Sequence, residues 1–233
     1  MYPLSDARLL EVWERAQRCS PVVRAVLLAA QSPDIAGRDP LQLSIGERDA
    51  AILGVRRATF GSQLQGFTQC PQCAERLEFD FDCSVLPAAP AALERTEFSA
   101  GNARFRLPTS RDLIAVAQER DAEKAACALL RRCCLDPSVT LECTDALMAE
   151  ADERIGALDA AADIRFGFTC SACAHVWDER LDIAAWCWDE VELKAQRLLS
   201  EVHRLAWAYS WSEAQILALS DARRRAYLEL CES

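Results

Sequence analysis

The chain has 233 residues, of which 51% are hydrophobic and 27% are charged, and its formal net charge is −10. A chain of this length and composition can bury a substantial core as one large domain or two small ones. The acidic excess counts against a protein that binds phosphate backbones, because such proteins carry basic surfaces. No basic segment leads into an apolar one near the N-terminus, and the longest apolar run, 25–30, is too short to span a bilayer. We therefore expect a cytoplasmic protein that does not bind membranes.

Residues 1–60 predict an N-terminal helical region of three helices, each with a start signal. Ser5 and Ser20 are N-cap candidates, and the proline after Ser20 suits the first position of a helix. Ser44 and Glu47 have the spacing of a capping box before the third helix.

Residues 61–107 predict β structure around a first cysteine motif. The motif GFTQCPQC occupies 66–73, and in the following segment, 77–81, apolar residues alternate with acidic ones, as in a half-buried strand. Phe105 indicates a further short strand. The proline- and alanine-rich segment 87–92 is the clearest linker in the chain.

Residues 108–162 predict a helical insertion. Thr109 and Asp112 have capping-box spacing, and the apolar periodicity that follows them predicts one helix as far as Cys133. A second helix is expected after Thr144.

Residues 163–187 predict a second β region that repeats the first. Alternating apolar residues in 164–168 lead into the motif GFTCSAC at 167–173, and Trp177, Leu181 and Ile183 suggest an exit strand.

Residues 188–233 predict a C-terminal helical hairpin region. Helical apolar spacing begins near Asp189, Ser212 is a cap for a short helix, and Ser220 starts the last one.

The two motifs are CxxC pairs that can supply four thiolates to one tetrahedral zinc ion. The candidate ligands are Cys70, Cys73, Cys170 and Cys173, and 96 residues lie between the two pairs. Among 12 cysteines two such pairs are only mildly surprising, so the strand patterns around both copies carry the prediction. We expect one structural zinc ion per chain, because four thiolates leave no position for a catalytic water.

The sequence leaves alternatives to this site open. Ala74 and Ala174 follow the second cysteine of each pair, where zinc knuckles usually have glycine, so a β core that has lost its metal is one alternative. A redox dithiol is another, although its CxxC opens a helix, whereas strand-like sequence continues here. We expect His175 to pack on Trp177 or to donate to a thiolate rather than to bind metal.

The other cysteines do not predict a disulfide framework, because no export signal is visible. Several lie in or beside apolar helical stretches and are interpreted as core residues: Cys19, Cys127, Cys133, Cys134 and Cys187. No catalytic pattern stands out, so we do not expect an enzyme or a small-molecule substrate.

Short segments along most of the chain resemble a known family. The segments that carry the likeness are Gly46-Glu47-Arg48-Asp49, Phe60-Gly61, Leu107-Pro108-Thr109, the Cys-x-x-Cys-x-His-x-Trp run ending at Trp177, Glu201-Val202-His203-Arg204-Leu205-Ala206, Trp211-Ser212-Glu213, Ile216-Leu217-Ala218-Leu219-Ser220, Arg223-Arg224 and Tyr227-Leu228. Together they resemble the T-even-phage-like baseplate hub assembly proteins, or chaperones, of phage tail and contractile injection system gene clusters. Ser210 stands where this family has glycine before the tryptophan, and Ala74 and Ala174 replace the knuckle glycines.

The resemblance implies a non-catalytic assembly factor or structural component whose partners are baseplate, hub or spike proteins. The fold expected is α+β and predominantly helical: a small split zinc-ribbon-like core, a helical insertion and helical arms. A partner surface is predicted on the C-terminal helices, at Trp207, Tyr209, Trp211, Arg223, Arg224 and Tyr227, unless these aromatic side chains pack on the ribbon instead. The alternative function is a zinc-ribbon regulator that binds nucleic acid through the arginine run, which the net charge disfavours.

Overall fold

The computed structural model describes residues 3–86 and 96–231, so the predicted linker 87–92 lies outside the described residues. The helices are α1 (Asp6–Ala16), α2 (Pro21–Ala29), α3 (Ile45–Phe60), α4 (Ser110–Val116), α5 (Ala122–Cys133), α6 (Asp145–Leu158), α7 (Ile183–Tyr209), α8 (Glu213–Leu217) and α9 (Asp221–Cys231). The strands of the described part form separate antiparallel hairpins: β1 (Gln63–Gln69) with β2 (Arg76–Asp82), β3 (Glu97–Ala100) with β4 (Ala103–Arg106), and β5 (Arg165–Thr169) with β6 (Val176–Arg180). The expectation of a mixed, mainly helical α+β fold is confirmed.

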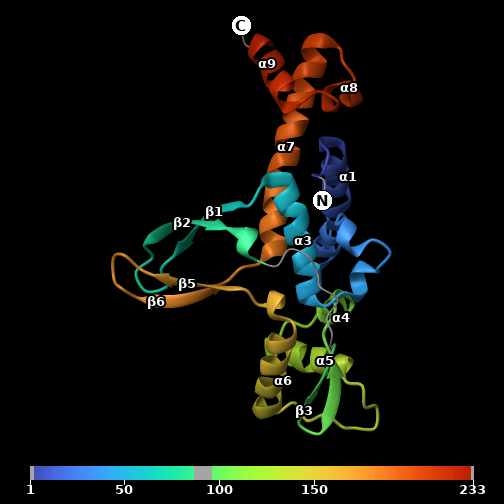
Figure 1. The fold of residues 1–233 in the computed structure, drawn as a ribbon, viewed down its shortest axis with the longest axis vertical. Helices are drawn as coiled ribbons and strands as arrows, with labels where there is room; N and C mark the ends of the chain where they lie inside the picture. The colour runs from blue at the N-terminus through green and yellow to red at the C-terminus, as the bar shows by residue number, and fades with distance from the viewer. Residues whose placement is uncertain (1–2, 87–95, 232–233) are drawn as a thin grey trace.

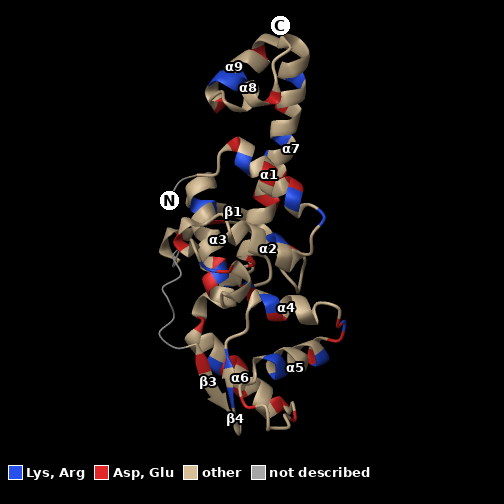
Figure 2. Cartoon of the chain, turned by 90° about the vertical axis from the view of Figure 1, so that its right-hand side faces the viewer, with Lys and Arg blue, Asp and Glu red and all other residues tan. Residues whose placement is uncertain are grey.

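The molecule is elongated, with a helical body at its middle (Figure 1). Two hairpins, β1–β2 and β5–β6, project together from one side of the body, α4 to α6 lie below it, and α8 and α9 cover the far end of α7. Acidic and basic residues are interspersed along the helices of both ends (Figure 2).

The body is held together by apolar packing among α1, α2, α3 and the first half of α7. Each helix contributes a completely buried side chain, here Leu9, Leu28, Ile52 and Val191. Burial of one such side chain contributes roughly 1.5–3 kcal/mol to folding. Arg56 of α3 adds a bidentate ion pair to Glu190 of α7, at 2.7 and 2.8 Å.

The helix starts agree with the sequence at two of the three N-terminal positions. Ser5 Oγ accepts a hydrogen bond from the Arg8 N–H, and Ser44 and Glu47 form the complete capping box. Helix α2 begins at Pro21 as predicted, but Ser20 makes no side-chain cap bond.

Two predicted elements differ from the structure. The single helix expected from residue 110 to Cys133 is divided into α4 and α5, because Asp121 accepts a hydrogen bond from the Lys124 N–H and starts a new helix. Ile183 is the first residue of α7 rather than part of an exit strand, since Asp182 caps that helix by accepting from the Ala185 N–H. Helix α7 therefore begins before Asp189.

The lower part of the molecule has its own core, formed by β3, β4, α5 and α6. Phe98 and Phe105 stack with their ring centres 5.4 Å apart. A disulfide joins Cys127 of α5 to Cys143, so the interpretation of Cys127 as an unpaired core residue is wrong. The α6 end of this part contacts the body, because Asp159 accepts a hydrogen bond from the Gly46 N–H at 2.9 Å.

In the described part of the chain, no helix is both long enough and apolar enough to cross a membrane.

Candidate metal centre

Each CxxC pair lies in the turn of a projecting hairpin, and the two turns have the same backbone hydrogen bonds. The Cys70 N–H donates to the Glu75 carbonyl at 2.9 Å, and the Cys170 N–H donates to the His175 carbonyl at 2.8 Å. In each turn the N–H after the second cysteine donates to the carbonyl of the first, at 2.8 and 3.0 Å. Two segments far apart in the sequence thus adopt one local geometry.

The residue after the second cysteine has a left-handed backbone in both turns. Ala74 has φ 60° and Ala174 has φ 58°. An L-residue with a side chain pays roughly 1–2 kcal/mol for this conformation, which glycine adopts freely. Both alanines therefore adopt the left-handed backbone conformation that favours glycine, and their backbone is strained.

The four cysteine sulfurs form one cluster, with all pairs within 4.8 Å of one another. Across the hairpins, the Sγ atoms of Cys70 and Cys173 are 3.6 Å apart, and those of Cys73 and Cys170 are 3.5 Å apart. Tetrahedral zinc with Zn–S bonds of about 2.3 Å requires sulfurs about 3.8 Å apart. The cluster can hold a metal ion, and the predicted ligand set is brought together.

The four cysteines differ in their exposure to solvent. Cys70 and Cys170, the first cysteine of each pair, are only 2% and 3% exposed, whereas Cys73 and Cys173 lie on the outer side. The inner thiols are therefore shielded from solvent by the hairpins.

The backbone of each turn directs N–H groups at the sulfurs. Burial raises the pKa of Cys170. Hydrogen bonds from the N–H groups of Cys173 and Ala172 and from the nearby thiols have the larger, opposite effect, and they lower this pKa to about 7. The Glu75 N–H lowers the pKa of Cys73, yet the contacts with Cys173 and the other thiols raise it to about 12. The pKa values of Cys73 and Cys170 thus shift in opposite directions, and N–H groups are in place to stabilise thiolates.

Aromatic side chains fill the space between the hairpins behind the cluster. Phe79 of β2 lies 5.4 Å from Phe168 of β5, and Phe81 lies 4.6 Å from Phe166, measured between ring centres. On the other edge Thr68 Oγ1 donates to Glu179. The hairpins therefore have a small apolar interface of their own.

This interface is anchored to the body by Trp186 of α7. The ring of Trp186 lies 6.0 Å from that of Phe79 and sits directly over Gly66. A Cβ atom on Gly66 would lie 2.2 Å from Trp186 Cη2, so only glycine allows this approach.

His175 lies beside the cluster but outside the ligand set. Its ring stacks on Trp177 with centres 6.0 Å apart and planes 13° apart. The prediction that His175 packs on Trp177 is confirmed.

The predicted partner residues at the C-terminal end fall into two groups. Tyr209, Trp211 and Tyr227 pack on one another, with ring centres 4.7 to 5.6 Å apart. They belong to the end of α7, the α7–α8 connection and α9, and this end of the molecule lies far from the hairpins (Figure 1). Trp207 is 86% exposed, and Arg223 is exposed. The alternative that the aromatic side chains pack on the ribbon is wrong for the three that form this cluster.

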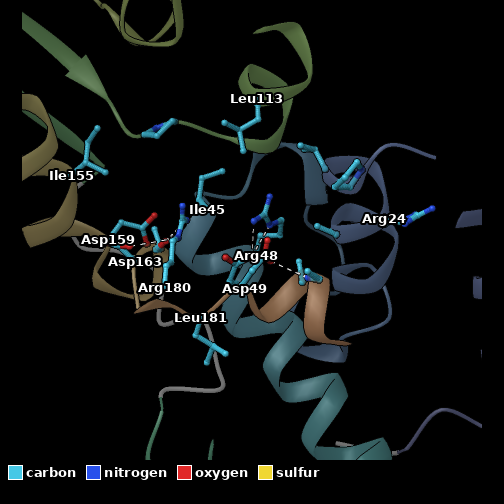
Figure 3. A pocket seen from close by; sticks show the side chains of 18 of the residues that line it. Arg24, Ile45, Arg48, Asp49, Leu113, Ile155, Asp159, Asp163, Arg180 and Leu181 are labelled. Carbon is cyan, nitrogen blue, oxygen red and sulfur yellow. Dashed lines mark hydrogen bonds and ion pairs between the residues drawn. The ribbon is translucent and has the colours of Figure 1, made fainter. Parts of the chain in front are cut away.

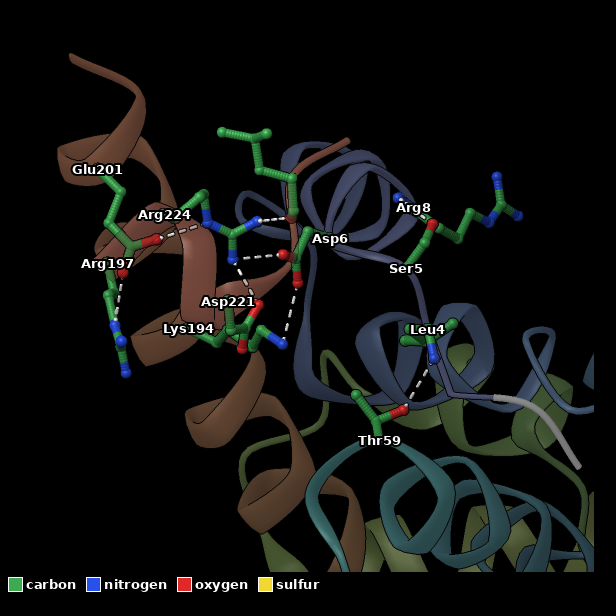
Figure 4. Close-up of polar contacts among 11 residues, drawn as sticks. Leu4, Ser5, Asp6, Arg8, Thr59, Lys194, Arg197, Glu201, Asp221 and Arg224 are labelled. Atoms are coloured by element: carbon green, nitrogen blue, oxygen red, sulfur yellow. Dashed lines mark hydrogen bonds and ion pairs between the residues drawn. The ribbon is translucent and has the colours of Figure 1, made fainter. Parts of the chain in front are cut away.

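Arg224 does not lie on a partner surface, because its side chain is only 2% exposed. It forms ion pairs with Asp6 at 2.6 Å, Glu201 at 2.9 Å and Asp221 at 2.7 Å, and Lys194 also pairs with Asp6 (Figure 4). We call these five side chains the Arg224 network. It ties the first helix to the last, and nothing in the local sequence indicates the pairs of Arg224 with Asp6 and Glu201.

The sequence matches no protein-family model, and comparison with curated proteins and with solved structures gave no match.

Proposed function

We propose that this protein is a non-catalytic assembly factor or structural component of the baseplate or hub of a contractile phage-tail-like particle, with one structural zinc ion held by the four clustered cysteines. The observation that carries the proposal concerns backbone conformation. In the described part of the chain, the non-glycine residues with positive φ are Ala74, Ala174 and Ser210. These are the positions at which the sequence departs from the glycines of the family it resembles. The residues that replace glycine at these positions thus keep the left-handed backbone conformation that favours glycine. This supports a resemblance in fold and not only in scattered short motifs.

Other segments of the resemblance take part in packing. Gly46 has no space for a side chain, because a Cβ atom there would lie 2.0 Å from Asp159 Oδ1. Thr109 forms an isolated β-bridge with Ser44, which joins the Leu107-Pro108-Thr109 segment to the start of α3. Trp211 and Tyr227 pack edge to face at 4.9 Å. These segments, far apart in the chain, therefore support one framework.

The energetics support zinc as a clasp between the hairpins. Closing the loop between the two cysteine pairs costs roughly 4 kcal/mol from its length. Structural zinc binding contributes roughly 10–16 kcal/mol. Binding exceeds the closure cost by enough to tolerate the strain at Ala74 and Ala174. Four thiolates also favour zinc over hard cations such as magnesium, which prefer oxygen ligands.

Nucleic-acid binding is the weaker alternative. The net charge is −10, and the central arginine of the run at 223–225 is buried in the Arg224 network. That run therefore cannot present three cations to a phosphate backbone.

The test of function is partner capture from cells that produce a contractile tail-like particle. The tagged full-length chain is expected to co-purify with baseplate, hub or spike proteins, and deletion of its gene is expected to leave particles without a complete baseplate. Salt-sensitive DNA binding by the purified chain, together with normal particles after deletion, would overturn the proposal.

A further inference from the structure

A cavity of ≈ 840 Å³ lies between the helical body and the lower part of the molecule. Its walls come from α2, α3, α4, α6 and the start of α7, so elements distant in sequence enclose it. Ile45, Leu113 and Ile155 supply apolar wall, and Figure 3 shows Arg48 and Asp49 between these and Leu181. No sequence motif indicated this cavity.

Asp49 is the unusual member of the lining. The residue is 9% exposed, and only its Oδ1 atom is engaged, by Arg48 Nε and Nη2 at 2.7 Å each. No hydrogen bond reaches Oδ2 from any of the described residues. Burial raises the pKa of Asp49 to about 6 despite the neighbouring Arg48, so the pair does not fully compensate the buried carboxylate. A second cation near Oδ2 would compensate the remaining negative charge of the Asp49 carboxylate.

The cavity lining as a whole has more acidic than basic side chains. Six aspartates and four arginines line it. Arg48 is paired with Asp49, and Arg165 and Arg180 both pair with Asp163. Arg24 donates to main-chain carbonyls and lies over Trp188, and in Figure 3 it points away from the cavity.

Four further aspartates of the lining have no ion pair with a basic side chain among residues 3–86 and 96–231: Asp152, Asp159, Asp182 and Asp189. Asp159 instead accepts a hydrogen bond from the Gly46 N–H. Two of these, Asp182 and Asp189, are on the first turns of α7 or at its cap, and Asp182 acts electrostatically on Asp49. Asp182 therefore adds to the negative potential at Asp49, and Arg180 offsets part of it.

We propose that this cavity binds an organic cation, a primary ammonium or guanidinium group on an apolar stem, with the cation beside Asp49 Oδ2. The stem would lie against Ile45, Leu113 and Ile155, while Asp182 adds long-range attraction. A lysine or arginine side chain of a partner and a free amine share this chemistry. The inference concerns a different site from the cysteine cluster and does not depend on the function proposed above.

The experiment uses the full chain with ¹⁵N-labelled tryptophan, because Trp188 lines the cavity and its indole N–H reports on occupancy. A Trp188→Phe variant assigns the signal. The probes are acetyl-Leu-Arg-Leu-amide, the same peptide with neutral citrulline in place of arginine, and n-butylguanidinium. The arginine peptide is expected to shift the Trp188 signal saturably and to bind at least about tenfold more tightly than the citrulline peptide.

Matched variants locate the cation. Asp49→Asn is expected to weaken binding of the arginine peptide about tenfold, and Asp182→Asn, which preserves the helix cap, about threefold. Asp80→Asn removes the same charge from the exposed face of β2 and is expected to change nothing.

The two sources are separated by the probes. Tighter binding of the arginine peptide than of n-butylguanidinium assigns the site to a partner segment, and equal binding assigns it to a free amine. The proposal is overturned if the Trp188 signal does not move at about 10 mM probe, if citrulline binds as well as arginine, or if Asp80→Asn weakens binding as much as Asp182→Asn.

Discussion

The cysteine cluster and the Arg224 network both join parts of the chain that are distant in sequence, but they do so differently. The cluster brings together two copies of one local motif, each with the same turn and the same left-handed alanine. The network joins Asp6 to α7 and α9 through Arg224 and Lys194, without any repeated pattern. A long-range contact can be predicted from the sequence when both contacting segments contain the same local motif, as the two CxxC hairpins do. A single buried charge such as that of Arg224 belongs to no repeated motif, so its partners cannot be predicted in this way.

The two regions also differ in what their loss leaves behind. Loss of a metal ligand removes an ion whose binding energy exceeds the loop-closure cost. Loss of Arg224 leaves several carboxylates close together and partly buried, which is destabilising in a different way. Metal removal, substitution of Arg224, acid and relief of backbone strain should therefore affect the chain to decreasing degrees.

Removal of the metal should have the largest effect. A strong chelator, or Cys170→Ser, is expected to cost several of the roughly 10–16 kcal/mol that structural zinc contributes, and to expose the amides of β1, β2, β5 and β6 to hydrogen exchange. Cys231→Ser is the control, since that cysteine is exposed on α9. If Cys170→Ser were as stable as Cys231→Ser, the clasp would be refuted.

Loss of Arg224 should have the next largest effect. Arg224→Met is expected to destabilise the chain by about 3–5 kcal/mol in urea denaturation, because it leaves Asp6 and Glu201 without their shared cation. Arg223→Met, one residue away and exposed, should change stability by less than about 0.5 kcal/mol. Equal effects of the two variants would mean that the network does not hold the C-terminal helices.

Acid should weaken the Arg224 network through Asp6. Burial raises the pKa of Asp6, but hydrogen bonds from Lys194 and Arg224 outweigh it and hold that pKa below its usual 3.8. A depressed pKa in the folded state gives stability that is complete above pH 3.8 and is lost as the pH falls through the lower value. Urea denaturation between about pH 6 and pH 3 should therefore show a smaller loss for Asp6→Asn than for the unaltered chain. Identical pH profiles would contradict this.

Relief of the backbone strain at Ala74 and Ala174 should have the smallest effect on stability. Ala74→Gly and Ala174→Gly are each expected to stabilise the metal-bound chain by about 0.5–1 kcal/mol, since the strain of roughly 1–2 kcal/mol is partly offset by the flexibility of glycine when unfolded. Ala172→Gly, in the same turn without a positive φ, should not stabilise. Thermal denaturation measures all three, and a lower melting temperature for both Ala→Gly changes would contradict the strain.

The two cysteine-bearing hairpins and most helix starts could be predicted from the sequence, because their signals are local. Of the β3–β4 hairpin only the strand near Phe105 was predicted. The alternation at 77–81 and the capping box at Ser44 each lie within a few residues. The break between α4 and α5 was missed because apolar residues continue on both sides of the Asp121 cap. The disulfide of Cys127 and the burial of Arg224 were missed because each depends on a partner that only the tertiary fold brings near.

The candidate site shows the same division. All four cysteines were identified from spacing and flanking strands, and the structure brings their sulfurs together. Trp186, which anchors the hairpins over Gly66, was not identified, because a tryptophan on a long helix gives no sign of which glycine it will contact. The cavity beside Asp49 likewise depends on how separate elements meet.

If one zinc ion joins the two hairpins, the chain purified without chelator must contain it. Elemental analysis is expected to give about one zinc per chain, and far less in Cys70→Ser, as a four-thiolate site requires. A zinc content below about half an ion per chain in the unaltered protein would contradict a shared zinc ion.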